Sequence, residues 1–328
     1  MKYDVFGIGS AIMDFLIEVE HEQLIEFDLK KGNFHLIDED KSKELMGKLE
    51  KYEVKLAPGG SSANTLFGVS LLGGDVVFCG KVGDDGHGGI YEEKMASGGV
   101  KPKLAKSDKI TGHAITFITP DSERTFAVHL GAAMHLAKED VFFDDLKESK
   151  ILHIEGYQLE EEGLKLVSLH AMDFAKGNGT KISIDLGDPG IVSRNKEDIR
   201  HMVRKYADIV FANEEEAKAL TGMDPEDALN EIAGMTEIAI VKVGKDGSYI
   251  KKGEDMVEIP CYDAKAVDTT GAGDMYAAGV LFGISKGHNL KAAGHIGSYY
   301  ASKVVERIGA RLDKIDAKEV EELIAKVK

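Results

Sequence analysis

The segment Asp268-Thr269-Thr270-Gly271-Ala272-Gly273-Asp274 leads into a long apolar helical pattern that starts near Met275. Its glycines allow consecutive backbone N–H groups to converge on one point, and a helix N-terminus adds roughly half a positive charge there. Such a pocket favours an anion. Asp274 falls in the first helical turn, where an ionised carboxylate is stabilised and can accept a proton from a hydroxyl. The segment therefore indicates phosphoryl or acyl transfer, with ordinary helix N-capping as the structural alternative.

The composition indicates a folded protein with a small-molecule partner. Of the 328 residues, 43% are hydrophobic and 30% are charged, which is typical of a globular chain rather than a disordered one. The net charge of −16 opposes binding to nucleic acid or to an anionic membrane surface. A bound phosphate would therefore be held by local groups: backbone amides, a metal ion and a few basic side chains.

The sequence also bears on location. The first residues lack the apolar core of a signal peptide, and no stretch of about 18 apolar residues occurs, so we expect a cytoplasmic protein. The two cysteines, Cys79 and Cys261, lie far apart, which fits a reducing compartment and excludes a disulfide framework. We expect both to be buried as small hydrophobic side chains.

Apolar β-branched runs alternate with amphipathic helical patterns, which is typical of a parallel α/β fold. The predicted buried strands are 5–9, 76–82, 151–154, 182–185, 209–212 and 238–243. The predicted crossover helices include 39–52, 61–72, 161–176 and 214–221, and the chain from 272 onward is mostly helical. Because no low-complexity linker interrupts the pattern, we expect one large domain over residues 1–328.

Four segments show strand-like alternation without intervening helices: 15–20, 33–37, 114–119 and 124–130. Asp121-Ser122-Glu123 lies between the last two in the position of a hairpin turn. These segments could form edge strands of the main sheet. The alternative, which we adopt as the domain prediction, is a discontinuous β lid inserted at about 15–38 and 112–130 that covers the open end of that sheet.

Three glycine-containing or polar motifs follow predicted strands. In Pro58-Gly59-Gly60-Ser61-Ser62-Ala63-Asn64, the glycines allow a ligand to approach the backbone, and the Asn64 amide could bind sugar hydroxyls. Asn213 and Glu216 have the spacing of a capping box, and the same carboxylate could orient water on a magnesium ion. Val241 to Gly247 places Gly244 and Gly247 at the same sheet edge, as a nucleotide wall.

Other nucleotide-binding fingerprints are absent. Gly80-Lys81 is followed by Val82 and not by the Ser or Thr of a P-loop. Gly7-Ile8-Gly9 is followed by Ile12 where a dinucleotide-binding fold needs a third glycine, which leaves an oxidoreductase with little support. The sequence also lacks the His-Arg-Asp and Asp-Phe-Gly motifs of protein kinases.

Taken in order, five motifs resemble those of the ribokinase-like (pfkB) family of sugar and nucleoside kinases. They are Gly7-Ile8-Gly9-Ser10 with Asp14, the Pro58 to Asn64 segment, Gly83-Asp84-Asp85-Gly86, Asn213 with Glu216, and Asp268 to Asp274. The resemblance implies a three-layer α/β/α fold with a mostly parallel central sheet and a small β-sheet lid. Within the family the chain is most similar to the adenosine kinase branch, through residues 29–49, Glu123-Arg124-Thr125, and Ala293-Gly294-His295 with Ala301-Ser302.

The resemblance also implies residue roles. Asp274 would be the general base, the amides of Gly271, Ala272 and Gly273 would form the anion hole, and Arg124 would reach from the lid to the phosphoryl group. The acceptor would be held by Ser10, Asp14, Gly59, Gly60 and Asn64. Glu216 would hold Mg²⁺ through water. ATP would contact Asn213, Lys242, Gly244, Gly247, Asp268 and Thr269.

The implied function is transfer of a phosphoryl group from ATP, with Mg²⁺, to a primary hydroxyl of a ribose-containing substrate. Adenosine is the leading acceptor, and ribose, fructose or a similar sugar is the alternative, because Ser10 and Gln158 depart from the pattern of adenosine kinases. A monovalent cation is a further candidate cofactor, and the protein would be a monomer or homodimer. A catalytically silent ligand sensor is a remote alternative, disfavoured because Gly271 to Asp274 are all present.

Overall fold

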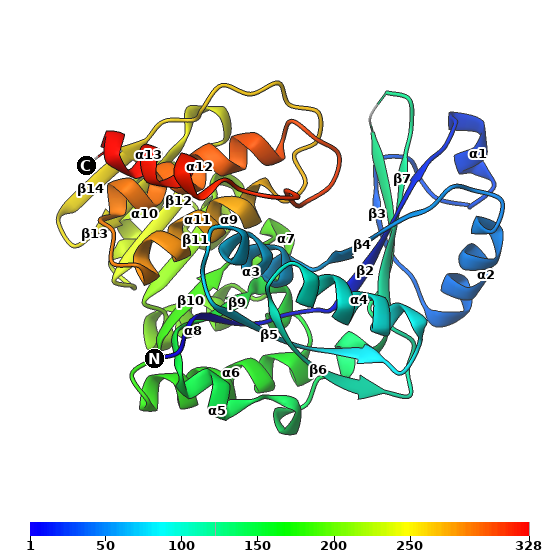
Figure 1. The fold of residues 1–328 in the computed structure, drawn as a ribbon, viewed down its shortest axis with the longest axis horizontal. Coiled ribbons are helices and arrows are strands. Elements are labelled where there is room, and N and C mark those ends of the chain that lie inside the picture. The colour runs from blue at the N-terminus through cyan, green and yellow to red at the C-terminus, as the bar shows by residue number, and fades with distance from the viewer. Residues whose placement is uncertain (122, 328) are drawn as a thin grey trace.

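A nine-stranded sheet runs through the main part of the molecule, which is described by a computed structural model over residues 1–121 and 123–327 (Figure 1). Its order is β14-β13-β12-β11-β10-β9-β1-β5-β6, parallel from β12 to β6, with β13 and β14 antiparallel at one edge. The strands are β1 (Tyr3–Ile8), β5 (Val76–Gly83), β6 (Lys101–Ser107), β9 (Ser149–Glu155), β10 (Lys181–Asp185), β11 (Ile209–Asn213), β12 (Ile238–Lys242), β13 (Ser248–Lys252) and β14 (Asp255–Ile259). All six predicted buried strands are present, which confirms the α/β fold class.

Helices cover both faces of this sheet, so its central strands are buried on both sides and their sequences are almost continuously apolar (Figure 1). One face carries α3 (Ser61–Leu71), α4 (Gly86–Ser97), α11 (Ala272–Ser285), α12 (Leu290–Val304) and, outside α12, α13 (Ala317–Val327). The other carries α5 (Phe143–Lys147), α6 (Glu162–Gly177), α7 (Pro189–Arg194), α8 (Lys196–Tyr206), α9 (Glu214–Thr221) and α10 (Pro225–Ala233). Short 3-10 helices are η1 (Gly131–His135), η2 (Lys138–Asp140), η3 (Gly156–Leu159) and η4 (Gly244–Asp246). In the described residues, no helix has the length and apolar character needed to cross a membrane.

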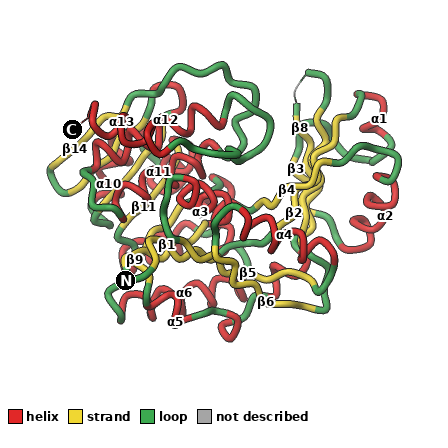
Figure 2. Tube along the Cα trace, viewed as in Figure 1, coloured by secondary structure: helices red, strands yellow, loops and turns green. Residues whose placement is uncertain are grey.

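A second, five-stranded sheet stands beside the main domain, with α1 (His21–Ile25) and α2 (Glu39–Leu49) on its far side (Figure 2). Its order is β3-β8-β7-β2-β4, and the strands are β2 (Ile12–Glu18), β3 (Phe34–Leu36), β4 (Lys55–Gly59), β7 (Gly112–Ile118) and β8 (Arg124–His129). The four segments with strand-like alternation thus lie in a separate sheet and not at the edge of the main one. β7 and β8 pair antiparallel as predicted for a hairpin, although Ser122 of the predicted turn lies outside the described residues.

Three local expectations are wrong. The helix predicted at 39–52 does not cross over within the main sheet, because α2 follows β3 and precedes β4, both strands of the second sheet, and packs on β8. α1 also intervenes between β2 and β3, where no helix was expected. Cys79 is buried in β5, but Cys261 is exposed because it lies in the loop that follows β14.

The Gly83-Asp84-Asp85-Gly86 motif connects the two sheets. Asp85 caps α4 by accepting a hydrogen bond from the Gly88 amide at 2.8 Å. The same carboxylate accepts from the amide and the hydroxyl of Thr111, each at 2.7 Å. Thr111 immediately precedes β7, so Asp85 ties a helix of the main domain to the base of the second sheet.

Substitution Asp85→Ala should lower the free energy of unfolding by roughly 1–3 kcal/mol, since it removes a helix cap and two further hydrogen bonds to a carboxylate. Burial raises the pKa of Asp85, but the hydrogen bonds from Thr111 and Gly88 outweigh it and hold the pKa below its ordinary value. The stabilisation is therefore present above the ordinary pKa of about 4 and is lost as the pH falls below it. Urea unfolding at pH 7 and pH 3, with the exposed Asp84→Ala as control, would measure this. Equal midpoints for the two variants would contradict the assignment.

Candidate active site

The residues predicted to act on ligands gather where the parallel strands of the main sheet end. The predicted residues Asn213 and Lys242 are the last residues of β11 and β12, and ligands of open α/β sheets bind at this edge. Asp185, which was not predicted, ends β10 beside them. Helices α3 and α11 also begin here, so their N-terminal amides face the same region. The second sheet stands opposite this edge of the main sheet (Figure 1).

A cavity of about 510 Å³ lies between the second sheet and the main domain. The second sheet contributes an apolar wall, made by Leu16, Leu56, Ala114 and Phe126. The polar groups on the cavity come from both sides and include Asp14, Asn64, Arg124, Thr270 and Arg311. A cavity with one apolar wall and a few converging polar groups suits a small polar molecule that also carries an apolar ring or edge.

Gly59 and Gly60 are required by the close approach of neighbouring groups. A Cβ atom on Gly59 would lie 2.5 Å from both carboxylate oxygens of Asp14, so any side chain there would displace that carboxylate. Gly60 has φ +92°, and a Cβ atom would lie 2.1 Å from the carbonyl oxygen of Ser10. The two glycines thus bring Asp14 and the start of α3 to the same side of the cavity.

Asp274 lies in the first turn of α11 and is held by two side chains of α3. Its Oδ1 accepts from the Ser61 hydroxyl at 2.7 Å, and its Oδ2 accepts from Nδ2 of Asn64 at 2.9 Å. Burial raises the pKa of Asp274 to about 6, against the lowering effect of the hydrogen bonds from Asn64 and Ser61. A carboxylate with this pKa is ionised near neutral pH and is a stronger base than an exposed aspartate.

The predicted anion loop adopts the turn that precedes α11. Gly271 is the N-cap, with φ +78°, and the helix begins at Ala272, three residues before Met275. The Ala272 amide donates to the Thr269 carbonyl at 3.2 Å. A Cβ atom on Gly273 would lie 3.3 Å from Nζ of Lys242, so this ammonium group stands directly beside the loop.

Lys242 is surrounded by carboxylates. Its Nζ lies 3.3 Å from Oδ2 of Asp185, and Asp185 and Glu216 together raise the pKa of Lys242 although burial opposes the ammonium form. Burial and the neighbouring Asp185 raise the pKa of Glu216 to about 7. The cluster thus combines one buried cation with two oxygen donors of the kind that Mg²⁺ prefers.

Asn213 and Glu216 form the predicted capping box at the start of α9. The Glu216 carboxylate accepts from the Asn213 amide at 2.8 Å and from its side-chain Nδ2 at 2.7 Å, and the Asn213 Oδ1 accepts from the Glu216 amide. The capping role is therefore present in the structure, and it leaves both carboxylate oxygens with further acceptor capacity.

Arg124 and Asp268 connect the second sheet with the predicted anion loop before α11. Nη2 of Arg124 forms a short ion pair with Oδ2 of Asp268, and Nη1 donates to the Thr270 hydroxyl at 3.1 Å. Asp268 also accepts from the amides of Thr270 and Gly309, at 3.0 and 2.7 Å. Arg124 thus reaches from β8 to the loop, and Asp268 holds that loop to the segment after α12.

The remaining predicted residues are Gly244, Gly247, Thr269 and Ser10. Gly244 and Gly247 bound η4 after β12, and Thr269 is exposed in the loop before α11. Ser10 is buried: its amide donates to Oε1 of Glu155 at 3.1 Å, and its hydroxyl accepts from Nε2 of Gln158 at 2.8 Å.

Three residues of this region were not predicted. Asp185 ends the predicted strand 182–185 and Glu155 follows the predicted strand 151–154, so the kind of position that drew attention to Asn213 could have identified both. Glu155 accepts from the amides of Ser10 and Ser62 and thereby joins the two segments that border the cavity beneath the second sheet. Arg311 lies in the irregular segment between α12 and α13, where no pattern in the sequence marks it.

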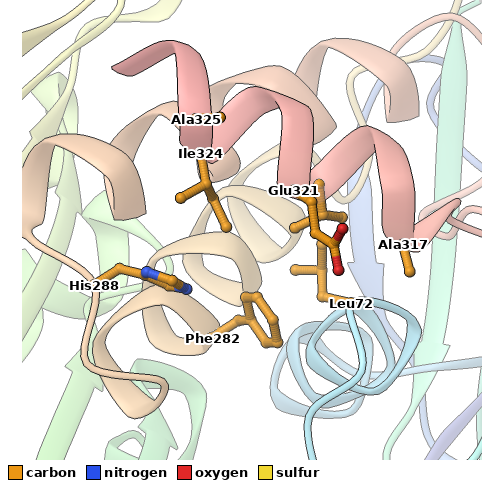
Figure 3. Close-up of a pocket in the computed structure, with 8 residues that line it drawn as sticks. Leu72, Phe282, His288, Ala317, Glu321, Ile324 and Ala325 are labelled. Atoms are coloured by element: carbon orange, nitrogen blue, oxygen red, sulfur yellow. The ribbon is translucent and has the colours of Figure 1, made fainter. Parts of the chain in front are cut away.

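A second cavity, of about 500 Å³, lies away from these residues, between α13 and the ends of α3 and α11 (Figure 3). Ile324 and Glu321 project from α13 toward Phe282 and Leu72 (Figure 3). None of the residues predicted to be functional lines this cavity.

Comparison with known proteins decides the family. The sequence profile of the pfkB family carbohydrate kinases matches residues 27–317. The chain belongs to this family. An adenosine kinase from Sinorhizobium meliloti is 34% identical in sequence and superposes with a TM-score of 0.89, over 98% of this chain and 99% of the other. A probable sugar kinase from Rhizobium etli is 32% identical with a TM-score of 0.90, over 100% and 99% of the two chains.

Among curated relatives, a 5-dehydro-2-deoxygluconokinase from Bacillus licheniformis is 30% identical over 338 residues, which is 99% of this chain and 96% of that protein. The chain is therefore a kinase of the pfkB family, whose members act on sugars or nucleosides. Kinases of this family use ATP, typically with Mg²⁺.

Proposed function

We propose that this protein transfers the terminal phosphoryl group of ATP, with Mg²⁺, to a primary hydroxyl of a ribose-containing acceptor, most readily a nucleoside such as adenosine. The observation that carries the proposal is the position of Asp274 at the N-terminus of α11, where it accepts a hydrogen bond from Asn64. Asn64 lines the cavity of about 510 Å³, which is the proposed acceptor cavity. The relatives include an adenosine kinase that matches this chain almost end to end.

In the proposed reaction the acceptor ribose lies between Asp14, Asn64 and the Gly59-Gly60 backbone, and its base lies against the apolar wall of the second sheet. Asp274 accepts the proton of the attacking hydroxyl. The Gly271 and Gly273 amides, with Lys242, offset the negative charge that is spread over the transferred phosphoryl group, whereas the Ala272 amide already donates to Thr269. Arg124 supplies a further cation from the second sheet, and closure of that sheet over the cavity excludes water.

Glu216 and Asp185 are the groups that would hold Mg²⁺, which would neutralise phosphate charge and fix the geometry of the nucleotide. Their carboxylates lie beside Lys242 at the sheet edge. Asn213, Gly244, Gly247, Asp268 and Thr269 would border the nucleotide.

A sugar kinase is the second candidate, and one specific contact favours it. Gln158 is buried and hydrogen-bonded to Ser10, so this position offers no aromatic ring on which a purine could stack. Several curated relatives are 5-dehydro-2-deoxygluconokinases, which also leaves a sugar acceptor open.

An acceptor screen tests the proposal. ADP release with Mg²⁺ and ATP should be fastest with adenosine or another nucleoside, compared with ribose, fructose and 5-dehydro-2-deoxygluconate under the same conditions. Turnover of a free sugar with none on nucleosides would overturn the nucleoside assignment and leave the kinase assignment intact. Absence of ADP release with every acceptor would overturn both.

The pH dependence of the reaction should report the base. Because Asp274 must be ionised to accept a proton and its pKa is raised to about 6 by burial, kcat/KM for the acceptor should fall as the pH drops below about 6. Above that value the rate should level off. Initial rates between pH 5 and 8 at saturating ATP and Mg²⁺ measure the profile, and a flat profile over this range would contradict Asp274 as the base.

A further inference from the structure

Arg311 contacts Asn64, a predicted acceptor-binding residue, and is connected through it to Asp274, the predicted base. Its Nε donates to Oδ1 of Asn64 at 2.7 Å, and Nδ2 of the same Asn64 donates to Oδ2 of Asp274 at 2.9 Å. The three side chains therefore form a continuous chain of hydrogen bonds, Arg311 to Asn64 to Asp274. Arg311 also lines the acceptor cavity.

The chemistry of the two end groups fixes the orientation of the amide between them. A guanidinium group can only donate hydrogen bonds, and an ionised carboxylate can only accept them. The amide of Asn64 must therefore point its oxygen toward Arg311 and its nitrogen toward Asp274. Without Arg311, Asn64 would lose the partner of its oxygen, and the amide could rotate away from the carboxylate.

The surroundings of Arg311 show that it is held rigidly. Its guanidinium carbon lies 4.7 Å from the centre of the Phe67 ring, and Nη1 donates to the sulfur of Met95 at 3.2 Å. Among the described residues, its buried Nη2 has no hydrogen-bond partner. A half-buried arginine whose Nη2 donor is buried and unused beside a cavity is unfavourable if the side chain serves packing alone.

We propose that Arg311 is a positioning residue for phosphoryl transfer: it locks the Asn64 amide so that this amide holds the carboxylate of Asp274 toward the acceptor hydroxyl. The inference rests on the proposed function, because it gives Arg311 a role in the same reaction. It also assigns a function to the segment between α12 and α13, which the Gly309 amide fastens to Asp268.

Substitution Arg311→Met should lower kcat by roughly 10- to 100-fold, since a displacement of the base of about 1 Å has effects of this size. KM for ATP should change little, because neither Arg311 nor Asn64 is among the residues assigned to the nucleotide. Arg311→Lys, which keeps the charge and one donor, should restore part of the lost rate. Arg307→Met is the matched control: it removes an arginine of the same segment whose guanidinium pairs with the exposed Asp313, and it should keep kcat within about twofold.

A double-mutant cycle tests whether Arg311 affects the rate through Asn64. If Arg311 acts through Asn64, the pair Asn64→Ala with Arg311→Met should lose no more rate than Asn64→Ala alone. Losses that multiply would overturn the inference, and so would a kcat for Arg311→Met equal to that of the parent. Should Arg311→Met fold poorly, Arg311→Gln keeps a neutral donor and enters the same cycle.

A measurement without turnover separates this inference from the proposed function. Carboxyl ¹³C resonances of aspartate, with Asp274 assigned by its loss in Asp274→Asn, report the titration of Asp274 in the free protein. Arg311→Met should shift this titration to higher pH, because the carboxylate loses a firmly held donor and a nearby cation. An unchanged titration would overturn the role of Arg311 even if the kinase is active. Lack of any kinase activity in the parent, with the shift present, would overturn the proposed function alone.

Discussion

Substitution Asp274→Asn is expected to lower kcat by roughly 10²- to 10⁴-fold, the range that a positioned general base contributes. The asparagine amide has nearly the same shape but cannot take the proton of the acceptor hydroxyl. Its oxygen can still accept from Asn64 Nδ2, and its nitrogen can donate to Ser61 Oγ, because a serine hydroxyl accepts as well as donates. Steady-state rates with Mg²⁺ and ATP at pH 7.5 give the loss directly.

Binding should survive the change. The affinities for acceptor and ADP, measured by calorimetry, should stay within a few-fold of the parent, because Asp14, Gly59 and Gly60 are untouched. Asp263→Asn, an exposed change in the loop before the catalytic segment, is a control that should leave both rate and affinity unaltered. A parent protein that binds both ligands but never turns over would instead identify a ligand sensor. Turnover of Asp274→Asn near the parent rate would show that another group is the base.

The sequence alone predicted the parts of the fold whose signals are local. The buried strands are continuous runs of β-branched and apolar residues, and the capping box at Asn213 and Glu216 depends on a spacing of three residues. The start of α11 beside Asp274 follows in the same way from its glycines. Such features are visible because the residues that make them are neighbours in the chain.

The parts that sequence analysis missed depend on contacts between distant segments. Arg311 and Asn64 are 247 residues apart, and nothing near either residue indicates that they meet. α2 has the apolar spacing of any amphipathic helix. Only the places of its neighbours β3 and β4, both strands of the second sheet, show which sheet it covers. The position of the Lys242 ammonium group beside the predicted anion loop also depends on tertiary structure, since Lys242 is the last residue of β12 while Gly273 lies in α11.

Removal of that cation, Lys242, is the second change for which we expect a large loss of activity and stability. Substitution Lys242→Met leaves Asp185 and Glu216 together without a counter-charge, and loss of one partner of a buried ion pair typically costs about 3–5 kcal/mol of stability. The same change removes a positive charge that stands beside Gly273, where the proposed reaction places the phosphoryl group. We therefore expect kcat/KM for ATP to fall on the order of 100-fold or more. Urea unfolding and steady-state kinetics at varied ATP concentration measure the two losses separately.

Two further variants separate the structural role of Lys242 from its role toward phosphate. Lys242→Arg keeps the charge and should retain most of the stability. The pair Asp185→Asn with Lys242→Met removes both charges, so it should recover much of the stability lost in Lys242→Met but none of the activity. If the pair regained activity along with stability, Lys242 would serve folding only.

The pH dependence of the stability loss gives an independent check on Lys242. Burial and Asp185 raise the pKa of Glu216 to about 7, and Lys242 acts in the opposite direction, so removal of Lys242 should raise this pKa further. A carboxyl whose pKa is higher in the folded protein than in the unfolded chain binds a proton on folding, and stability then falls as the pH rises. The deficit of Lys242→Met relative to the parent should therefore be larger at pH 8 than at pH 6. A deficit that does not change with pH would mean that Lys242 exerts no electrostatic control over the carboxylates beside it.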